Sequence, residues 1–264
     1  MVDFLNLIRN ENMKMFRAPR LFVMLGIVLA LVIAISSVWF TVDKGQTAMW
    51  EVIITETMFL YWIVTIFAVI VASGTVAEEF STGTIKLLLI RPWNRSKILL
   101  SKYISSLLFA LFFAIVFLAS LLLVNWIFFD LLGNGESVER LSQFTSMSNS
   151  EYMFKYYGLL FLNTVMTVTI SFMLSTVFRS SVLAIAMALF IEIVVNNLMQ
   201  LLAFVKYKWI DYVLFVHLDL TKFVGGNVAS DGKTLGFSLS VLGVYYVIFI
   251  ALTWIIFNKR DVAS

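Results

Sequence analysis

Long runs of apolar residues, separated by short polar connections, dominate the chain from residue 21 onward. A helix that crosses a bilayer needs about 20 mostly apolar residues, and six runs in the sequence meet this length. The pattern therefore predicts six transmembrane helices, at residues 21–40, 53–76, 98–129, 158–178, 182–204 and 235–257. The predicted fold class is an all-α integral membrane protein, with residues 1–264 forming a single transmembrane domain.

The first 20 residues have a different pattern. Phe4, Leu5 and Ile8 recur at near-helical spacing, and polar residues fall on the other side. This amphipathic pattern predicts an N-terminal helix that lies in the membrane interface over residues 1–20. Pro19 would end that helix and direct the chain into the bilayer. The alternative is a disordered basic leader.

The composition agrees with the membrane class. Hydrophobic residues make up 61% and charged residues 13%, against about 45–50% and about 25% in soluble domains. Membrane lipid is therefore an expected partner, and the absence of a basic stripe with interleaved aromatics argues against nucleic acid. The chain has no cysteine and one histidine, His217, so we predict no thiolate or multi-histidine metal site and no catalytic residues.

The distribution of basic residues predicts the orientation. With both termini in the cytoplasm, the inner segments hold twelve of the 19 Lys and Arg residues. Inner loops of membrane proteins carry an excess of Lys and Arg. We therefore expect a multi-pass protein of the cell membrane with both termini cytoplasmic.

The most informative stretch, residues 78–102, separates two of the long apolar runs. It opens with Glu78 and Glu79 and is interrupted by Pro92. Residues 80–91 have helical propensity, Ser81 or Thr82 can cap the start, and Pro92 stops the end. The sequence predicts a short cytoplasmic helix between the second and third spanning helices. The alternative is a basic loop that only fixes the topology.

This stretch resembles the signature of ABC-2 type permeases, the membrane subunits of type-2 ATP-binding cassette (ABC) exporters. The resemblance lies in the string E-E-F-S-T-G-T-I-K-L-L-L followed by R-P-x-x-R-x-K. It implies that the stretch is a coupling helix region, which contacts a nucleotide-binding subunit. The residues that would couple to the ATPase are Glu78, Glu79, Phe80, Ser81, Thr82, Gly83, Thr84, Lys86, Arg91 and Arg95.

The resemblance also implies the partners: two ATP-binding cassette ATPase subunits and a second permease, either another copy or a related chain. The sequence has no G-x-x-x-x-G-K-[ST] phosphate loop. We therefore expect no cofactor in this chain, with ATP and Mg²⁺ bound by the partner, and a transport subunit rather than an enzyme. The short outer loops are similar to permeases of antibiotic-peptide and lantibiotic immunity, which confer antibiotic resistance, and to sodium-extrusion permeases. An amphipathic or lipid-like cargo would fit the mostly apolar bundle.

Polar residues inside the predicted spans are the other candidates. Glu192 lies well within the fifth run, and Asn196 and Gln200 follow on the same helical face. Asn163 and Thr167 begin a stripe down the fourth run that continues to Ser171 and Ser175. These side chains cannot all face lipid. They line a cargo path or a subunit interface, or they form hydrogen bonds that hold the bundle together.

Glu56 and Asp130 lie near the outer ends of their predicted helices, so we expect both to reach water. Other functions remain open at this point. An ion-coupled carrier could use Glu192 as its ion site, and a non-transporting sensor or assembly subunit would show the same pattern. An intramembrane enzyme is disfavoured, because no nucleophile with a base is found in the spans.

Overall fold

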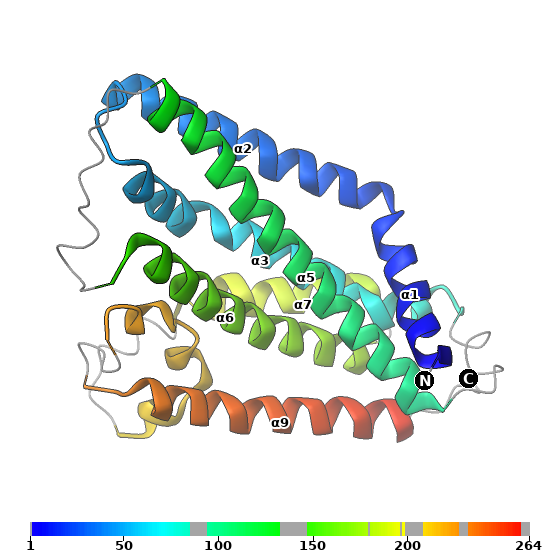
Figure 1. The fold of residues 1–264 in the computed structure, drawn as a ribbon. Helices are drawn as coiled ribbons and strands as arrows, with labels where there is room; N and C mark the ends of the chain where they lie inside the picture. The colour runs from blue at the N-terminus through cyan, green and yellow to red at the C-terminus, as the bar shows by residue number, and fades with distance from the viewer. Residues whose placement is uncertain are drawn as a thin grey trace.

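The computed structural model describes residues 2–84, 94–132, 147–178, 180–195, 197–198, 208–226 and 232–259. In these ranges the chain forms helices joined by turns (Figure 1). Five helical segments are long and apolar enough to cross a membrane. They are α2 (Pro19–Asp43), α3 (Met49–Ser81), α5 (Arg95–Asn125) with its continuation η1 (Trp126–Leu131), α6 (Asn149–Val177) and α9 (Leu235–Lys259).

Helix α3 is the centre of the bundle. It contacts α2, α5, α6 and α7 (Ser181–Phe190), and buried positions occur on all sides of it from Val52 to Ala77. A helix that is apolar around its whole circumference is stable only when other helices or lipid surround it. Its long apolar run therefore explains its central position.

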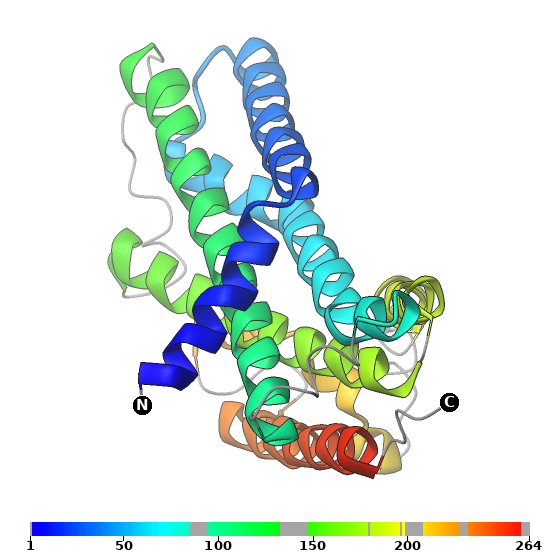
Figure 2. The same cartoon turned by 90° about the vertical axis from the view of Figure 1, so that its right-hand side faces the viewer.

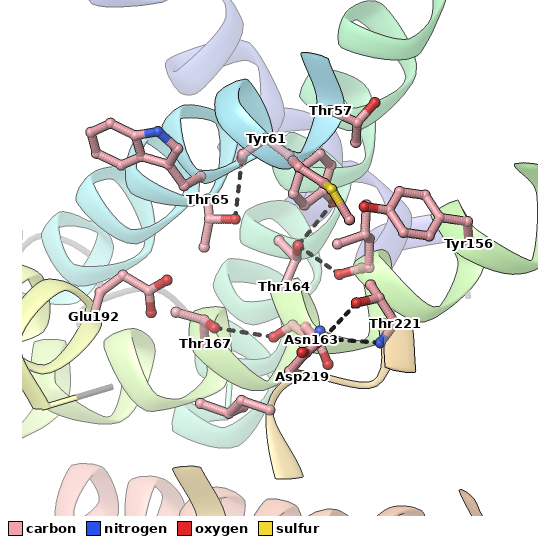
Figure 3. A pocket seen from close by; sticks show the side chains of 14 residues that line it. Thr57, Tyr61, Thr65, Tyr156, Asn163, Thr164, Thr167, Glu192, Asp219 and Thr221 are labelled. Carbon is pink, nitrogen blue, oxygen red and sulfur yellow. Dashed lines mark hydrogen bonds between the residues drawn. The ribbon is translucent and has the colours of Figure 1, made fainter. Parts of the chain in front are cut away.

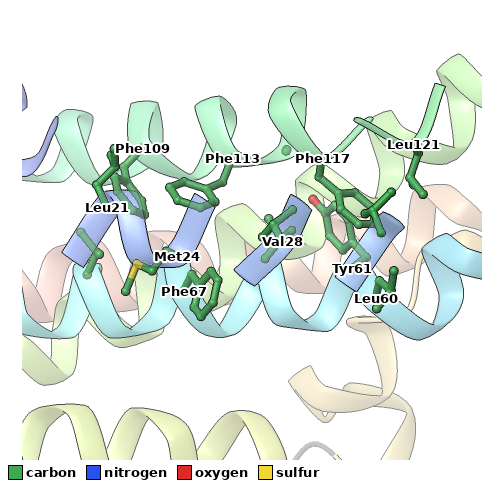
Figure 4. Packing of buried hydrophobic residues seen from close by; sticks show 14 of the residues in the cluster. Leu21, Met24, Val28, Leu60, Tyr61, Phe67, Phe109, Phe113, Phe117 and Leu121 are labelled. Atoms are coloured by element: carbon green, nitrogen blue, oxygen red, sulfur yellow. The ribbon is translucent and has the colours of Figure 1, made fainter. Parts of the chain in front are cut away.

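Aromatic rings fill the space between α2, α3 and α5 (Figure 4). Phe113 of α5 lies 6.0 Å from Phe67 of α3, and Phe117 lies 5.8 Å from Tyr61, measured between ring centroids. Val28 of α2 closes the same cluster. These three helices are thus packed into one unit.

Helix α1 (Val2–Phe16) lies against α5 near the start of that helix (Figure 2). The last turn of α9 is beside the same region, where Arg95 Nη1 donates a hydrogen bond of 3.3 Å to the Asn258 carbonyl. Tyr103, Phe172 and Phe257 also pack together there. We call this end of the molecule, with α1, the end of α3 and the start of α5, the α1 end.

Short 3-10 helices close the opposite end of the bundle. They are η4 (Lys208–Tyr212), η5 (Leu214–His217) and η6 (Thr221–Phe223). His217 is buried among them, within 3.0 Å of Ser238 Oγ and 2.8 Å of the Asp211 carbonyl. It has a structural role.

A helix boundary differs from the predicted one where residues of a predicted loop cap a helix or become buried. Helix α6 begins at Asn149 rather than at residue 158, so the predicted outer loop is helical over residues 149–157. Ser148 caps this start by accepting a hydrogen bond from Glu151 N at 3.3 Å. Met153 and Tyr156 are buried in the added turns, which gives the packing that stabilises them.

The fifth predicted span is described only in its first part. Helix α7 covers ten residues and continues as the π-helix η3 (Ile191–Val195). Residues 196 and 199–204 lie outside the described residues. A count of six spanning helices therefore stays a prediction, as does the interfacial position of α1, whose helical structure is confirmed.

Candidate functional site

Four charged side chains from three helices meet at the α1 end. Lys102 of α5 donates to Glu11 Oε2 of α1 at 2.8 Å and to Glu79 Oε1 of α3 at 2.6 Å. Lys14 donates to Glu11 Oε1 at 2.8 Å and to Glu79 Oε1 at 3.2 Å. We call Glu11, Lys14, Glu79 and Lys102 the ion network. It joins α1, α3 and α5.

The ion network is largely shielded from solvent. The side chains of Lys102, Glu11 and Glu79 are 1%, 6% and 13% exposed. Buried charges are tolerated only when they are paired and hydrogen-bonded, and two ammonium groups here balance two carboxylates. Removing one partner of such a buried pair costs far more than removing one partner of a surface pair.

The charges shift two pKa values in the network. Burial opposes ionisation of Glu11, but the ammonium groups of Lys102 and Lys14 outweigh it and lower the pKa of that carboxyl. Burial likewise opposes the charge of Lys14, and its carboxylate partners Glu11 and Glu79 raise the pKa of the amine. The stability that Glu11 contributes is therefore present above its unfolded pKa and is lost as pH falls through the lowered folded pKa.

Glu11 is a functional candidate that sequence reasoning missed. It is spaced four residues from Leu7 and from Met15, and these three residues form the buried side of α1. Residues four apart lie on one face of a helix. A carboxylate in the middle of an apolar stripe is the signal that could have identified Glu11.

The predicted coupling residues at the end of α3 lie beside the ion network. Phe80 and Ser81 belong to the last turn of α3, so of the two predicted cap residues, Ser81 and Thr82, Ser81 does not start a new helix. Its hydroxyl instead donates to the Glu78 carbonyl at 3.0 Å. Thr82 follows the helix and Gly83 has a φ of 72°, a left-handed conformation that glycine adopts without strain.

The other members of this set are placed as follows. Glu78 Oε1 accepts from Arg20 Nη1 at 2.8 Å in a half-exposed pair, Phe80 packs near Val76 and Leu99, and Arg95 bonds to Asn258. Lys86 and Arg91 lie outside the described residues, as does most of the predicted coupling helix. A cavity of about 400 Å³ opens between α1 and the end of α3; its lining includes Arg20, Glu78, Glu79, Thr82, Thr84 and Lys102.

A second cavity of about 350 Å³ lies between α3, α6, η3 and η6 (Figure 3). Three of the predicted path residues, Glu192, Asn163 and Thr167, line it together. We call this cavity the polar pocket. Asn196 and Gln200, predicted for the same path, lie outside the described residues.

The polar pocket also contains side chains that sequence reasoning did not connect to it. Thr57 and Tyr61 of α3 and Asp219 before η6 complete its wall. Its charged lining residues, Glu192 and Asp219, are both carboxylates, and Asn163 Oδ1 has no hydrogen-bond partner among the described residues. The pocket can thus accept hydrogen bonds and positive charge from a bound molecule.

The lower part of the α6 stripe has a structural role. Ser175 Oγ accepts hydrogen bonds from the backbone nitrogens of Val76 and Ala77 in α3, at 2.9 and 3.0 Å. Ser171 Oγ instead donates within its own helix, to the Thr167 carbonyl at 2.8 Å. The prediction that this stripe serves helix packing is confirmed at Ser175.

Ser175→Ala is therefore expected to lower the free energy of unfolding by about 0.5–1.5 kcal/mol, because the buried hydrogen bonds between α6 and α3 are lost. Thermal unfolding of the purified protein measures this. Ser171→Ala is the matched control, since it removes a hydroxyl of equal burial that no other helix uses. Equal losses in the two variants would contradict the cross-helix role of Ser175.

One carboxylate lies where the sequence did not lead us to expect it. Glu56 is fully buried, so the prediction that it reaches water is wrong, whereas Asp130 is exposed as predicted. Glu56 Oε2 accepts from Asn125 Nδ2 at 2.7 Å. The helices α2 and η1 both contact α3.

Comparison with known proteins gives a family but no activity. Residues 21–263 match the sequence model of a family described as "Protein of unknown function (DUF2705)". The chain is 36% identical over 226 residues to the "Uncharacterized protein YhcI" of Bacillus subtilis (strain 168), which covers 84% of this chain and 71% of that protein. It is 29% identical over 195 residues to the "Uncharacterized membrane protein YdbK" of the same organism, covering 74% of this chain and 76% of the relative. The apolar helices and this likeness indicate a multi-pass membrane protein.

Proposed function

The chain belongs to the DUF2705 family, and we propose that it is the transmembrane permease subunit of an ATP-binding cassette exporter in the cell membrane. A separate subunit would hydrolyse ATP and bind Mg²⁺. The observation that carries the proposal is the ion network, which ties α1, α3 and α5 together beside the residues that resemble a coupling region.

The position of Glu78–Thr84 supports this role. The segment comprises the last turn of α3 and the turn after it, and Glu79 is bonded to Lys102 of α5 and Lys14 of α1. A force on the segment would therefore act on all three helices at once. Conformational changes in transporters commonly occur as rigid-body movements of such packed units.

The path of the chain supports six membrane crossings. Phe172, near the end of α6, packs at the α1 end, whereas Leu214 of η5 packs with Leu242 near the start of α9 at the opposite end. Residues 178 and 213 thus lie at opposite ends of the bundle, and α7 follows the first of them. The α1 end is then the cytoplasmic end, with both termini on that side and α1 in the interface.

The polar pocket is the proposed part of the cargo path, or of the interface between two permease copies. Helix α7, which continues into η3, exposes apolar side chains, with Val182 73% and Leu183 55% exposed. A face of this kind suits lipid or a second permease chain. A polar cavity beside a face that a second chain covers would be enclosed in the dimer.

The proposed cycle requires that ATP favours one state of the permease. Shifting a two-state equilibrium from 1:99 to 99:1 needs a differential affinity of about 5.5 kcal/mol. Closure of the ATPase subunits would supply it, through contacts with the α1 end that exist in the outward-open state alone. An amphipathic cargo would then leave through the outer end of the bundle.

Two other functions lead to different observations. An ion-coupled carrier would use Glu192 of the polar pocket and would transport without nucleotide. A sensor or assembly subunit would bind partners without moving a cargo. Co-purification tests the proposal directly: the chain should bring down an ATP-binding subunit whose ATPase activity depends on it.

Gly83→Ala provides a sharper test in that complex. A Cβ at Gly83 would meet open space. The substitution therefore destabilises this turn only through the left-handed backbone conformation, by about 1–2 kcal/mol. If the coupled state needs this turn, ATPase stimulation should fall by about five- to thirty-fold. Gly158→Ala, in the middle of α6 and also in open space, should leave stimulation unchanged. Normal stimulation in Gly83→Ala would argue against a coupling role for this segment.

A further inference from the structure

Glu56, Asn125 and Ser36 meet inside the bundle at the end opposite the ion network. Glu56 is in the second turn of α3, Asn125 is the last residue of α5, and Ser36 is in α2. Each of the three residues is 0% exposed. None of them lines the polar pocket or the cavity at the α1 end, so this cluster is separate from both sites described above.

Three oxygens of the cluster lack hydrogen-bond partners among the described residues: Glu56 Oε1, Asn125 Oδ1 and Ser36 Oγ. The amide nitrogen of Asn125 is fully used, since it donates to Glu56 Oε2 at 2.7 Å and to the Leu121 carbonyl at 3.1 Å. The Ser36 hydroxyl lies beside the Glu56 carboxyl. A buried polar atom without a partner costs about 1–3 kcal/mol, so three such atoms from three helices indicate an occupant.

The occupant should be positively charged. None of the ion pairs among the described residues includes Glu56. From α6, the uncharged side chain of Tyr157 is bonded at 2.6 Å to Thr57, the neighbour of Glu56 in α3. A carboxyl in a low-dielectric interior is stable only with a counter-charge or with a bound proton.

We propose that Glu56, Asn125 and Ser36 form a buried site for a monovalent metal cation, of which Na⁺ is the representative. Carboxylate, amide and hydroxyl oxygens are hard ligands, which hard cations prefer. One carboxylate balances a single positive charge, and a divalent ion would leave an uncompensated charge in the interior. A proton on Glu56 is the other monovalent occupant, since Oε1 would then donate a hydrogen bond, and the test below separates the two.

The backbone at Asn125 supports the assignment. Helix α5 changes to the π-helix η1 directly after this residue, and π-helical segments occur frequently at functional sites. The Asn125 side chain takes the Leu121 carbonyl as an acceptor, so the side chain is held in place by a bond to its own helix. A cation bound here would tie α2, α3 and α5 together at the end opposite the ion network.

The test uses the purified full-length chain in detergent, without any ATPase partner, so it is independent of the proposed transport function. NaCl replaces choline chloride at constant total salt, and the melting temperature Tm is followed at neutral pH. A saturable rise of several degrees is expected, because a ligand that binds the folded state alone stabilises it. A parallel series with KCl reports selectivity.

Glu56→Gln should abolish the dependence on NaCl, and Asp130→Asn, which changes an exposed carboxylate of η1, should keep it. If Glu56→Gln does not fold, Ser36→Ala serves instead and should raise the half-saturating NaCl concentration at least tenfold. A Tm that does not respond to NaCl or KCl would overturn the proposal. A stabilisation by NaCl that Glu56→Gln retains would also overturn it. A stabilisation that appears only on acidification and is lost in Glu56→Gln would overturn it too, because the occupant would then be a proton.

Discussion

Replacing Lys102 by methionine should lower the free energy of unfolding by about 3–5 kcal/mol. Methionine is close to lysine in length and can fill the same space, so the loss comes from charge rather than from a cavity. Without the ammonium group, Glu11 and Glu79 share only Lys14, whose side chain is 48% exposed. Thermal or denaturant unfolding of the purified protein measures the loss.

Two variants separate charge from packing. Lys97→Met, at an exposed position of the same helix, should change stability by no more than about 0.5 kcal/mol. Combining Lys102→Met with Glu11→Gln and Glu79→Gln should recover most of the loss, because no buried carboxylate is then left unpaired. If the triple variant were as unstable as Lys102→Met, the assignment of the loss to charge would be wrong.

The triple variant also bears on the proposed function. It would fold, but α1, α3 and α5 would no longer be joined by ion pairs. If the ion network transmits force from the ATPase, stimulation of ATP hydrolysis should fall in this variant while stability stays near that of the native chain. A structural role alone would leave stimulation unchanged.

The five long apolar helices were predictable because long apolar runs determine them without knowledge of their neighbours. Helix ends were less so. Helix α6 starts at Asn149 because Met153 and Tyr156 find buried positions, and helix α3 includes Phe80 and Ser81 rather than stopping near residue 76. A polar segment can be helical because it packs against another helix, even where its own sequence pattern indicates a loop. The local pattern alone does not predict that packing.

The candidate site was predicted only in part, because its residues come together through the packing of distant helices. Glu78 and Glu79 stand out as a carboxylate pair next to an apolar run, but the partners of Glu79 are 65 and 23 residues away in the sequence. Lys102 and Glu11 are separated by 91 residues. A contact between such distant residues depends on how α1 folds back on α5, which a single sequence does not encode locally.

Glu56 illustrates the opposite error. The apolar run was predicted to start at Ile53, so Glu56 lay close to the end of the predicted helix, and this position indicated access to water. In the structure α3 begins at Met49 and η1 extends α5 at the same level. The carboxylate is therefore covered by helix rather than by loop.

Phe113→Ala is the second change with a large expected effect, a loss of about 3 kcal/mol in the free energy of unfolding. Phe113 is 0% exposed, and its ring centroid lies 4.7 Å from that of Phe109 and 6.0 Å from that of Phe67. Truncation of a buried Phe costs about 3–5 kcal/mol. The low end of this range applies in a bilayer. Lipid solvates the Phe113 ring in the unfolded state, so the loss arises mainly from packing.

Phe154→Ala is the matched control, because Phe154 is 87% exposed and its truncation leaves no cavity. The comparison also tests whether α2, α3 and α5 act as one lever. With a cavity between α3 and α5, a displacement at Glu79 would be absorbed by local movement rather than passed along both helices. ATPase stimulation should then fall in Phe113→Ala at a temperature where it is still folded, and not in Phe154→Ala. Full stimulation in a destabilised Phe113→Ala protein would mean that the helices move separately and that force takes another route.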